Sequence, residues 1–366
     1  MSAIIFGATH VEGATQKWSE AQAKDWYAKQ GWLVGANYIP ANAINQLEMW
    51  QADTFDPARI DLELGWSQKI GMNTMRVFLH DLAWDADPQG FKKRLDSFLA
   101  LCHKHRIKPM LVLFDSCWDP NPKLGKQHAP TAGVHNSGWV QGPGKAALAD
   151  PAQYMRLEKY VKDIVGTFGH DDRVLAWDVW NEPNNLNDSS YGKEEPANKV
   201  ELVLGLLPKA FAWARSTDPQ QPLTSGIWQG DWSADEKMGP MEQAQIALSD
   251  VVSFHNYDPP TEMEKRINLL KRYNRPLICT EYMARGNGSS FLTNVPVARA
   301  HDVAIYNWGL VQGKTQTYLP WDSWQNPYVG ERKPTIWFHD VFNTDGSPYV
   351  VEETEYLTRI LKPRPF

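Results

Sequence analysis

The segment RVLAWDVWNEP, residues 173–183, carries the pattern on which the fold prediction depends. Its apolar residues occupy both faces of an expected strand, as in a parallel strand that helices cover on each side. The run stops at Asn181, Glu182 and Pro183, and proline cannot continue a ladder of strand hydrogen bonds. A helix is expected next, over residues 199–216. The segment therefore predicts one strand–helix unit with an ionisable group at the end of the strand.

Further segments of the same kind lie on both sides of this unit. The expected strands are residues 32–38, 73–80, 107–114, 173–180, 222–227, 250–257, 276–281 and 304–311. The expected helices are residues 59–70, 91–106, 152–168, 199–216, 241–248, 262–273, 296–303 and 352–361. These eight alternating pairs predict an α/β fold, a (β/α)8 TIM barrel with long loops, and an open sheet of eight strands is the weaker alternative. We expect a single domain over residues 1–366, with residues 1–30 as an extension packed on the barrel.

The composition is typical of an ordinary globular protein and argues against nucleic-acid binding and against a membrane span. Hydrophobic residues make up 42% and charged residues 22% of the 366 residues, and the formal net charge is −6. A mildly acidic chain without a long basic run is a poor binder of nucleic acid, and no apolar run reaches the roughly 18 residues of a membrane span. The three cysteines lack metal-type spacing and no phosphate-loop or metalloprotease motif occurs, so we expect no metal and no cofactor. We expect a monomer.

The first residues of the chain, MSAIIFGATHVEG, lack the basic start and the long apolar stretch of a secretion signal. The protein is therefore either intracellular or has lost such a signal. Of the two, we favour a secreted or periplasmic protein whose signal was removed over a cytoplasmic one. The cysteine content leaves the compartment open, because three thiols give no disulfide framework.

Polar and ionisable residues gather where the expected strands end. They are Arg76, His80 and Asp81 on the second strand, Asp115 on the third, Asn181 and Glu182 on the fourth, His255, Asn256 and Tyr257 on the sixth, Glu281 on the seventh, and Asn307 and Trp308 on the eighth. The opposite ends of the strands carry no comparable set. Because reacting groups of a (β/α)8 barrel lie at the carboxyl ends of the strands and in the loops that follow, we expect the active site there.

Glu182 and Glu281 end the fourth and seventh strands, and barrel closure would bring both to one cavity. Two facing carboxyl groups suit hydrolysis of a glycosidic bond. One donates a proton to the leaving oxygen, and the other meets the positive charge that grows at the anomeric carbon. A lone glutamate at a strand end more often forms a salt bridge to a neighbouring loop. Asn181 weakens that alternative, since its amide offers a donor and an acceptor to a sugar hydroxyl.

The chain is rich in aromatic residues, with 17 Trp, 13 Tyr and 13 Phe. About half of these large aromatic residues should fill a large core. Others lie in loops, such as Trp118 and Trp139 in the Gly/Pro-rich segment 116–144, and Trp321 beyond the last expected strand. A flat ring in such a loop suits the apolar face of a sugar. Packing within a lid over the site is the alternative for Trp118 and Trp139.

Four motifs occur together at the ends of these strands. They are WNEP at residues 180–183, His-x-Tyr at residues 255–257, ICTE at residues 278–281 and NWGLVQGK at residues 307–314. In combination they resemble glycoside hydrolase clan A, and especially family 5, the cellulase family of retaining β-glycosidases. The resemblance implies a double displacement, with a carboxyl separation of about 5–5.5 Å and a covalent glycosyl-enzyme.

The resemblance also implies roles for residues at matching positions. Glu182 would be the acid/base and Glu281 the nucleophile. The supporting residues would be Asn181 on the 2-hydroxyl of the sugar, Arg76 and Tyr257 on the Glu281 carboxylate, His255 between the two acids, and Trp308 under the cleaved sugar. Pairing with Arg76 should lower the pKa of Glu281 and leave the proton on Glu182. Each supporting residue has a structural alternative, and Asp178 is expected to brace neighbouring strands.

One position departs from the family pattern. Many members carry a His near the end of the third strand, whereas this chain reads LVLFDSCW at residues 111–118. Asp115 or His80 would take that place. The predicted substrate is a β-1,4-linked glucan, mannan or xylan, or an oligosaccharide derived from one. Transglycosylation by the same residues and a barrel that binds sugar without cleaving it are the alternatives.

Overall fold

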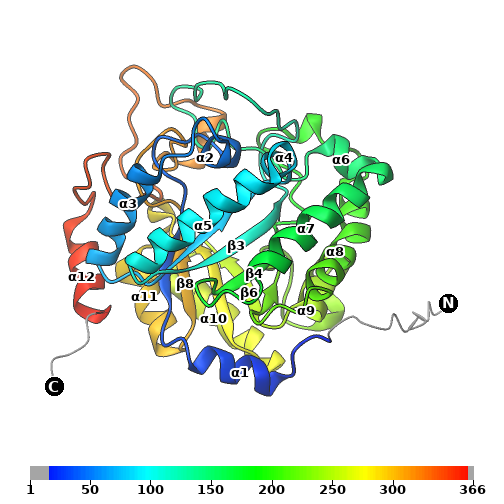
Figure 1. Ribbon diagram of the computed structural model, residues 1–366. Coiled ribbons are helices and arrows are strands. Elements are labelled where there is room, and N and C mark those ends of the chain that lie inside the picture. The colour runs from blue at the N-terminus through cyan, green and yellow to red at the C-terminus, as the bar shows by residue number, and fades with distance from the viewer. Residues whose placement is uncertain (1–15, 362–366) are drawn as a thin grey trace.

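Eight parallel strands form one sheet that closes into a barrel, as predicted (Figure 1). The computed structural model describes residues 16–361. The strands are β1 (Val34–Asn37), β2 (Thr74–Phe78), β3 (Lys108–Asp115), β4 (Ala176–Asn181), β5 (Leu223–Thr224), β6 (Val252–Asn256), β7 (Leu277–Tyr282) and β8 (Ala304–Asn307). Their order in the sheet is β5-β4-β3-β2-β1-β8-β7-β6. A parallel bridge between Ile227 and Phe254 joins the two edges, so the open-sheet alternative is wrong.

Helices connect successive strands and surround the barrel (Figure 1). They are α1 (Glu20–Ala28), α2 (Gln46–Trp50), α3 (Pro57–Lys69), α4 (Asp81–Ala86), α5 (Pro88–Lys104), α6 (Lys145–Ala149), α7 (Tyr154–Phe168), α8 (Lys199–Arg215), α9 (Pro240–Leu248), α10 (Pro260–Leu270), α11 (Phe291–Ala300) and α12 (Val351–Leu361). Short 3-10 helices span Pro151–Gln153, Gly192–Glu194, Asp235–Lys237, Lys271–Tyr273, Arg285–Asn287 and Trp321–Trp324. Several helices start as their sequences predict. Asp56 and Asp87, for example, cap α3 and α5 by accepting backbone N–H groups of the first turn.

Most predicted elements differ from the structure by one to three residues at an end, and three elements differ more in length or position. The strand expected at 222–227 is represented only by the short β5, and the strand expected at 304–311 only by β8. The helix expected at 296–303 corresponds to α11, which begins earlier because Ser290 and Thr293 form a capping box. The short helices α2, α4 and α6 are additional to the predicted set and lie in the connections after β1, β2 and β3.

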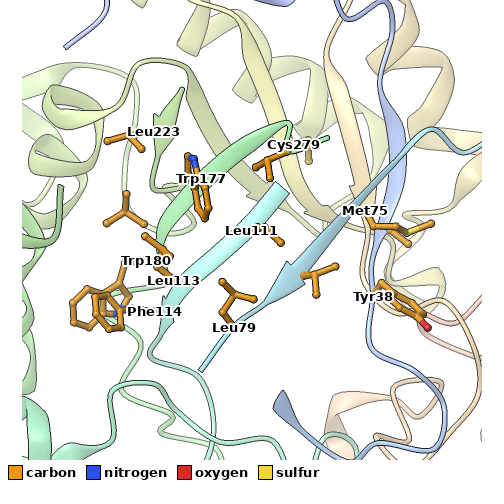
Figure 2. Packing of buried hydrophobic residues seen from close by; sticks show 14 of the residues in the cluster. Tyr38, Met75, Leu79, Leu111, Leu113, Phe114, Trp177, Trp180, Leu223 and Cys279 are labelled. Carbon is orange, nitrogen blue, oxygen red and sulfur yellow. The ribbon is translucent and has the colours of Figure 1, made fainter. Parts of the chain in front are cut away.

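Buried side chains pack in an outer layer against the helices and in an inner layer within the barrel. Figure 2 shows part of the outer layer, including Met75 of β2 and Leu111 and Leu113 of β3. Burying one such side chain contributes about 1.5–3 kcal/mol. Val112, between the two leucines, belongs to the inner cluster. Because side chains alternate along a strand, the same alternation turns Arg76 inward from β2, and this inner layer positions the site.

α1 covers the amino-terminal end of the barrel (Figure 1). Its residues Ala23 and Tyr27 pack with Leu175 and Val251, which directly precede β4 and β6. The Tyr27 hydroxyl also donates to the backbone carbonyl of Asp302 at 2.8 Å. Residues 16–30 of the predicted extension therefore pack on the barrel. Residues 1–15 of that extension lie outside the described part of the chain.

Two long connections lie at the opposite end of the barrel. Residues 116–144 join β3 to α6, and residues 308–350 join β8 to α12. In Figure 1 these segments, drawn in teal and orange, lie together at the end away from α1. They therefore surround the strand ends that carry the polar residues. Within residues 16–361, we find no helix long and apolar enough to cross a membrane.

Candidate active site

Glu182 and Glu281 lie beside each other at the carboxyl ends of β4 and β7. One carboxyl oxygen of each lies within 4.8 Å of the other, and a ring nitrogen of His255 lies in the same range. The side chains are nearly enclosed, with exposed fractions of 10% for Glu182 and 5% for Glu281. Glu182 follows the last residue of β4 and has a φ of 42°, a left-handed conformation that is uncommon outside glycine. Backbone strain of this kind clusters at functional sites.

Arg76 of β2 holds Glu281 from within the barrel. Its guanidinium donates to Glu281 Oε1 at 2.7 Å, to Asp178 Oδ2 at 2.7 and 2.9 Å, to Asn37 Oδ1 at 2.8 Å and to Asn181 Oδ1 at 2.7 Å. These contacts use all five N–H donors of the guanidinium group. Two carboxylates pair with this fully buried arginine, so its positive charge is more than offset. Asp178 thus links β4 to β2, in keeping with the bracing position expected for it.

Tyr257 and His255 approach the carboxyl groups from the end of β6. The Tyr257 hydroxyl donates to Glu281 Oε2 at 2.6 Å. His255 Nδ1 lies 2.8 Å from Glu182 Oε1 and 3.5 Å from Glu281 Oε2. An irregularity in the pairing of β6 with β7, between Phe254 and His255, sets His255 opposite Glu281. Burial lowers the pKa of His255 to about 4, so the neutral imidazole donates its Nδ1 proton to a carboxylate.

The second oxygen of Glu182 has two neutral donors that are not evident from the sequence. Cys117 Sγ lies 3.2 Å and Asn185 Nδ2 lies 2.7 Å from Glu182 Oε2. Burial raises the pKa of the Cys117 thiol well above its ordinary value, so the thiol keeps its proton and donates it. Both residues lie in loops, where no periodic pattern indicates which side chains turn inward. The only sequence signal for Cys117 is its place two residues after Asp115.

Burial raises the pKa of both carboxyl groups. The two neutral donors of Glu182 oppose this rise, and His255, Arg76 and Tyr257 oppose it at Glu281. Arg76 does pull the pKa of Glu281 down, as expected, but the expected net direction is wrong, because the lost solvation of a buried carboxylate outweighs the cation. An asymmetry remains. Glu281 bonds directly to a permanent cation, whereas the three donors to Glu182 are neutral.

Glu182, His255 and Glu281 are grouped closely enough to hold a metal ion. Their facing atoms, however, already bond to one another and to donors from Arg76 and Tyr257. The guanidinium, 2.7 Å from Glu281, would also repel a cation placed between the carboxyl groups. The arrangement is better suited to proton transfer and to attack by a carboxylate.

A cavity of about 480 Å³ opens over the two carboxyl groups. Its volume is in the range of small-molecule sites. The lining residues besides the glutamates are Cys117, Trp118, His135, Asn181, Asn184, Asn185, Leu186, Asn187, Asp188, Ser189, Ser190, Trp228, Gln229, Tyr257, Trp308 and Trp321. Aromatic faces together with amide and hydroxyl groups suit the apolar face and the hydroxyl rim of a sugar. The sequence does not predict the segment 184–190 and Trp228 as site residues. Loop sequences have no periodic pattern that indicates which side chains face a cavity.

Three of the four predicted tryptophans line the cavity, and one does not. Trp308 is 7% exposed and meets Trp139 edge-on, with ring centroids 5.6 Å apart. Trp118 and Trp321 also line the cavity, and Trp321 meets the ring of Tyr257 edge-on at 5.0 Å. Trp139 is buried behind Trp308 and is not part of the cavity wall. Trp139 therefore supports the aromatic floor instead of forming a platform for sugar.

Asp115 and His80, expected to replace the missing family histidine, lie behind the cavity wall. Asp115 accepts from Asn181 Nδ2 at 2.9 Å and from Trp139 Nε1 at 2.6 Å. Burial raises the pKa of Asp115 to about 6. His80 Nε2 donates to the backbone carbonyl of Gln141 at 2.9 Å, and its Nδ1 caps α4. Asp115 thus orients Asn181, and His80 joins a helix start to a loop, so neither is placed to contact a sugar directly.

Comparison with known families identifies one match that covers most of the site. A family profile described as Cellulase (glycosyl hydrolase family 5) matches residues 67–327. This span includes both glutamates and all strands except β1. No curated protein sequence matches the chain significantly.

Solved structures with the same fold share little sequence with the chain. The exo-β-1,4-mannosidase Op5Man5 from Opitutaceae bacterium strain TAV5 is 18% identical, with a TM-score of 0.56 over 90% of this chain and 59% of its own. An endo-β-1,4-mannanase from Thermotoga petrophila is 14% identical, with a TM-score of 0.56 over 92% and 78%. An endo-1,4-β-mannanase from Rhizomucor miehei is 12% identical, with a TM-score of 0.56 over 90% and 95%. At these identities the similarity shows a shared fold, and the chain spans 59% of the length of the mannosidase.

Proposed function

The chain belongs to glycosyl hydrolase family 5 and is a glycoside hydrolase acting on β-linked sugars, and from this premise we propose a retaining mechanism with Glu281 as nucleophile and Glu182 as acid/base. The observation that carries the proposal is the short distance between the carboxyl groups, which have oxygens within 4.8 Å of each other. Retaining glycosidases have carboxyl groups about 5–5.5 Å apart, whereas inverting enzymes leave about 6.5–9.5 Å for a water molecule. The spacing favours direct attack by one carboxylate.

In the first step, an oxygen of Glu281 forms a bond to the anomeric carbon while the bond from that carbon to the leaving oxygen breaks. The leaving oxygen takes the proton of Glu182. Arg76 and Tyr257 support the attack, because their bonds of 2.7 and 2.6 Å stabilise and orient the ionised form of Glu281. Asn181, which lines the cavity, would bond the 2-hydroxyl of the same sugar.

In the second step, Glu182 is a carboxylate and takes a proton from water. The water oxygen forms a bond to the anomeric carbon, and the bond from that carbon to Glu281 breaks. Two successive displacements restore the original configuration. Burial raises the pKa of Glu182, which suits a group that must give up a proton in one step and regain it in the next. His255 holds Glu182 through a bond of 2.8 Å in both steps.

The proposed substrate is a β-1,4-linked glucan, mannan or xylan, or an oligosaccharide from one of them. Trp308 would lie under the cleaved sugar, with Trp118 and Trp321 as further aromatic surfaces. β-1,4-Mannosides come first among the substrates to test, because the mannosidase and mannanases named above have the same fold. Both steps balance without a metal or cofactor. The whole chain would act as one catalytic domain and as a monomer.

Transglycosylation remains the second candidate, because the glycosyl-enzyme can pass its sugar to another sugar as well as to water. The same two carboxyl groups perform both reactions. Product analysis at rising concentrations of acceptor sugar separates them. A barrel that only binds sugar is disfavoured, since such a protein would have lost one of the two acids, and both Glu182 and Glu281 lie in the cavity.

The mechanism is tested by the configuration of the first product and by trapping of the intermediate. Proton NMR during turnover of a β-glycoside should show the β-anomer first. A 2-deoxy-2-fluoro glycoside with a good leaving group should become attached to the peptide that contains Glu281, as seen by mass spectrometry. A first product of α-configuration, or a label on another residue, would overturn the proposal.

A further inference from the structure

The two long connections at the mouth of the barrel are joined to each other. The backbone N–H of Asn136 donates to the carbonyl of Thr315 at 2.8 Å, and that of Tyr328 donates to the carbonyl of Gly133 at 2.9 Å. The backbone N–H of His135 donates to Ser323 Oγ at 3.0 Å. Residues 128–141 and 312–328 thus form one continuous structure, called the roof below.

The roof also packs tightly on the loop that follows β1. Asn45 Nδ2 donates to the carbonyl of Gly138 at 2.8 Å. A Cβ atom added to Gly138 would lie 2.2 Å from the side chain of Ile44, and one added to Gly313 would lie 2.3 Å from the carbonyl oxygen of Ala41. Chains that approach this closely leave no groove between them. The roof therefore closes the mouth on the side of β1.

A continuous row of rings forms the border of the cavity under the roof. Ring centroids lie 5.6 Å apart from Trp118 to His135, 5.3 Å from His135 to His339, 5.6 Å from His339 to Trp321, and 5.0 Å from Trp321 to Tyr257. All of these residues except His339 line the cavity. We call the five residues the aromatic wall. Adjacent rings at these distances leave no passage for a second sugar between them.

Beside Glu182, polar side chains instead of a row of rings form the border of the cavity. There its lining consists of polar side chains such as Asn184, Asn185 and Gln229, together with the half-buried Trp228. These residues come from the loops after β4 and β5. The roof touches the first of these loops only farther along, where the Tyr191 hydroxyl donates to the carbonyl of Ser137 at 3.3 Å and Gln325 Nε2 donates to the carbonyl of Ser189 at 3.0 Å. The acid must protonate the leaving oxygen, so the leaving part of the substrate extends from Glu182 into this region. The opposite end of the cleaved sugar then faces the aromatic wall.

From this arrangement we infer that the enzyme removes single sugar units from the non-reducing end of a β-linked chain. The inference rests on the proposed function and deepens it. The sugar over Trp308 has its anomeric carbon at the carboxyl groups, and the aromatic wall occupies the space into which a preceding sugar would extend. Only a sugar with nothing attached at its non-reducing end fits. The open side accommodates the rest of the chain through its amide groups and Trp228.

The test compares fluorogenic 4-methylumbelliferyl β-monoglycosides and β-biosides of glucose, mannose and xylose with the wild-type enzyme. The monoglycoside of the preferred sugar should release fluorophore at once, with kcat/KM at least about tenfold above that of the bioside. The bioside should release fluorophore after a lag, with monosaccharide as the first product. A hexasaccharide labelled at its reducing end should shorten by one unit at a time. Disaccharide as first product, or labelled fragments from internal cleavage, would overturn the inference.

A variant of the wall makes the test specific. Trp118 has a φ of 70°, a conformation that glycine adopts readily, so Trp118→Gly removes the ring without backbone strain. Direct release of fluorophore from the bioside, relative to the monoglycoside, should rise at least about tenfold. Trp337→Ala is the matched control, because Trp337 stacks on Tyr349 and lies outside the cavity lining. The role of the wall would be contradicted if the rate of direct release from the bioside relative to the monoglycoside stayed unchanged in Trp118→Gly. An equal rise of this rate ratio in Trp337→Ala would contradict it as well.

The outcomes separate this inference from the function on which it rests. An α-configured first product contradicts the retaining mechanism. The order in which products appear tests only the inference that single sugars are removed from the non-reducing end. Turnover with retained configuration but internal cleavage would be consistent with the proposed roles of Glu182 and Glu281. It would show that the aromatic wall does not exclude a sugar on the non-reducing side of the cleaved one.

Discussion

Glu281 and Glu182 are the same residue type at the ends of two strands of one barrel, yet the two surroundings differ in charge. Glu281 bonds to the guanidinium of Arg76 and to the hydroxyl of Tyr257. Glu182 bonds only to neutral donors, from His255, Cys117 and Asn185. The pKa of both groups is raised by burial, so burial alone does not distinguish them. The difference in partners shows how one side chain can serve as an anion and the other as a proton carrier.

The largest effect is expected for Glu281→Gln, which removes the nucleophile. The loss in kcat should be at least about 10³-fold, as when other catalytic nucleophiles are removed, and it should be similar for oligosaccharides and activated aryl glycosides. Steady-state rates on both kinds of substrate measure it. Circular dichroism and the melting temperature should show a folded protein. Turnover close to wild type on an aryl glycoside would remove Glu281 from its proposed role.

Glu182→Gln should have a large effect only where the leaving group needs a proton. A lost general acid costs about 10²–10⁴-fold, which we expect for oligosaccharides. A dinitrophenyl glycoside, whose leaving group departs without a proton, should form the glycosyl-enzyme nearly as fast as with wild type. Pre-steady-state release of dinitrophenol measures this step. Equal losses on both substrates would contradict the division of roles between the two glutamates.

Arg76→Met removes the cation on which the asymmetry depends. An opposite charge in contact lowers a carboxyl pKa by about 1–3 units, so the variant should raise the pKa of Glu281 further. Because the nucleophile must be ionised, the acid limb of kcat/KM should move to higher pH by a similar amount. Leaving Glu281 and Asp178 without their partner should also cost about 3–5 kcal/mol of stability.

Arg76→Lys is the matched control for this variant, since it keeps the charge and loses part of the hydrogen bonding. Its acid limb should shift less than that of Arg76→Met. The pH dependence of kcat/KM and urea denaturation measure the two effects separately. An acid limb that stays in place in Arg76→Met would show that the cation does not tune Glu281.

The smallest effect is expected at Cys117, which donates to Glu182. Its hydrogen bond lowers the pKa of Glu182, so Cys117→Ala should raise that pKa. Because the acid must be protonated, the alkaline limb of kcat/KM should then move to higher pH. Cys117→Ser restores a stronger donor and should move the limb back or to lower pH. Cys102→Ala, at a buried position in α5, is the control and should leave both limbs unchanged. If the alkaline limb of kcat/KM lies at the same pH in Cys117→Ala, Cys117→Ser and Cys102→Ala, the thiol of Cys117 has no role in setting the pKa of Glu182.

The sequence could predict the barrel and the strand ends because both depend on local patterns. Apolar runs and turn residues mark strands, and closure then brings Arg76, Glu182 and Glu281 to one end. The positions of His255 and Tyr257 could be predicted for the same reason. The helix expected at 296–303 begins at Phe291 in the structure, since a capping box at Ser290 starts the helix ahead of Pro296.

Other site features could not be predicted because they depend on contacts between distant loops. Cys117 and Asn185 meet Glu182 through two connections that have no periodic pattern. Asp115 ends a strand, as a site residue would, but Trp139 and Asn181 occupy its oxygens from behind the cavity. The direction in which a loop side chain points is set by its neighbours in space.

By itself, the sequence determined which elements form, which acids end the strands and which chemistry those acids suit, because strand periodicity and residue type are local properties. Only the tertiary structure decided the approach of the carboxyl oxygens to within 4.8 Å of each other, the net rise in the pKa of Glu281 and the wall that closes one side of the cavity. The physical reason is that solvation and Coulomb interactions depend on distances in space. Those distances are set by packing between residues that lie far apart in the chain.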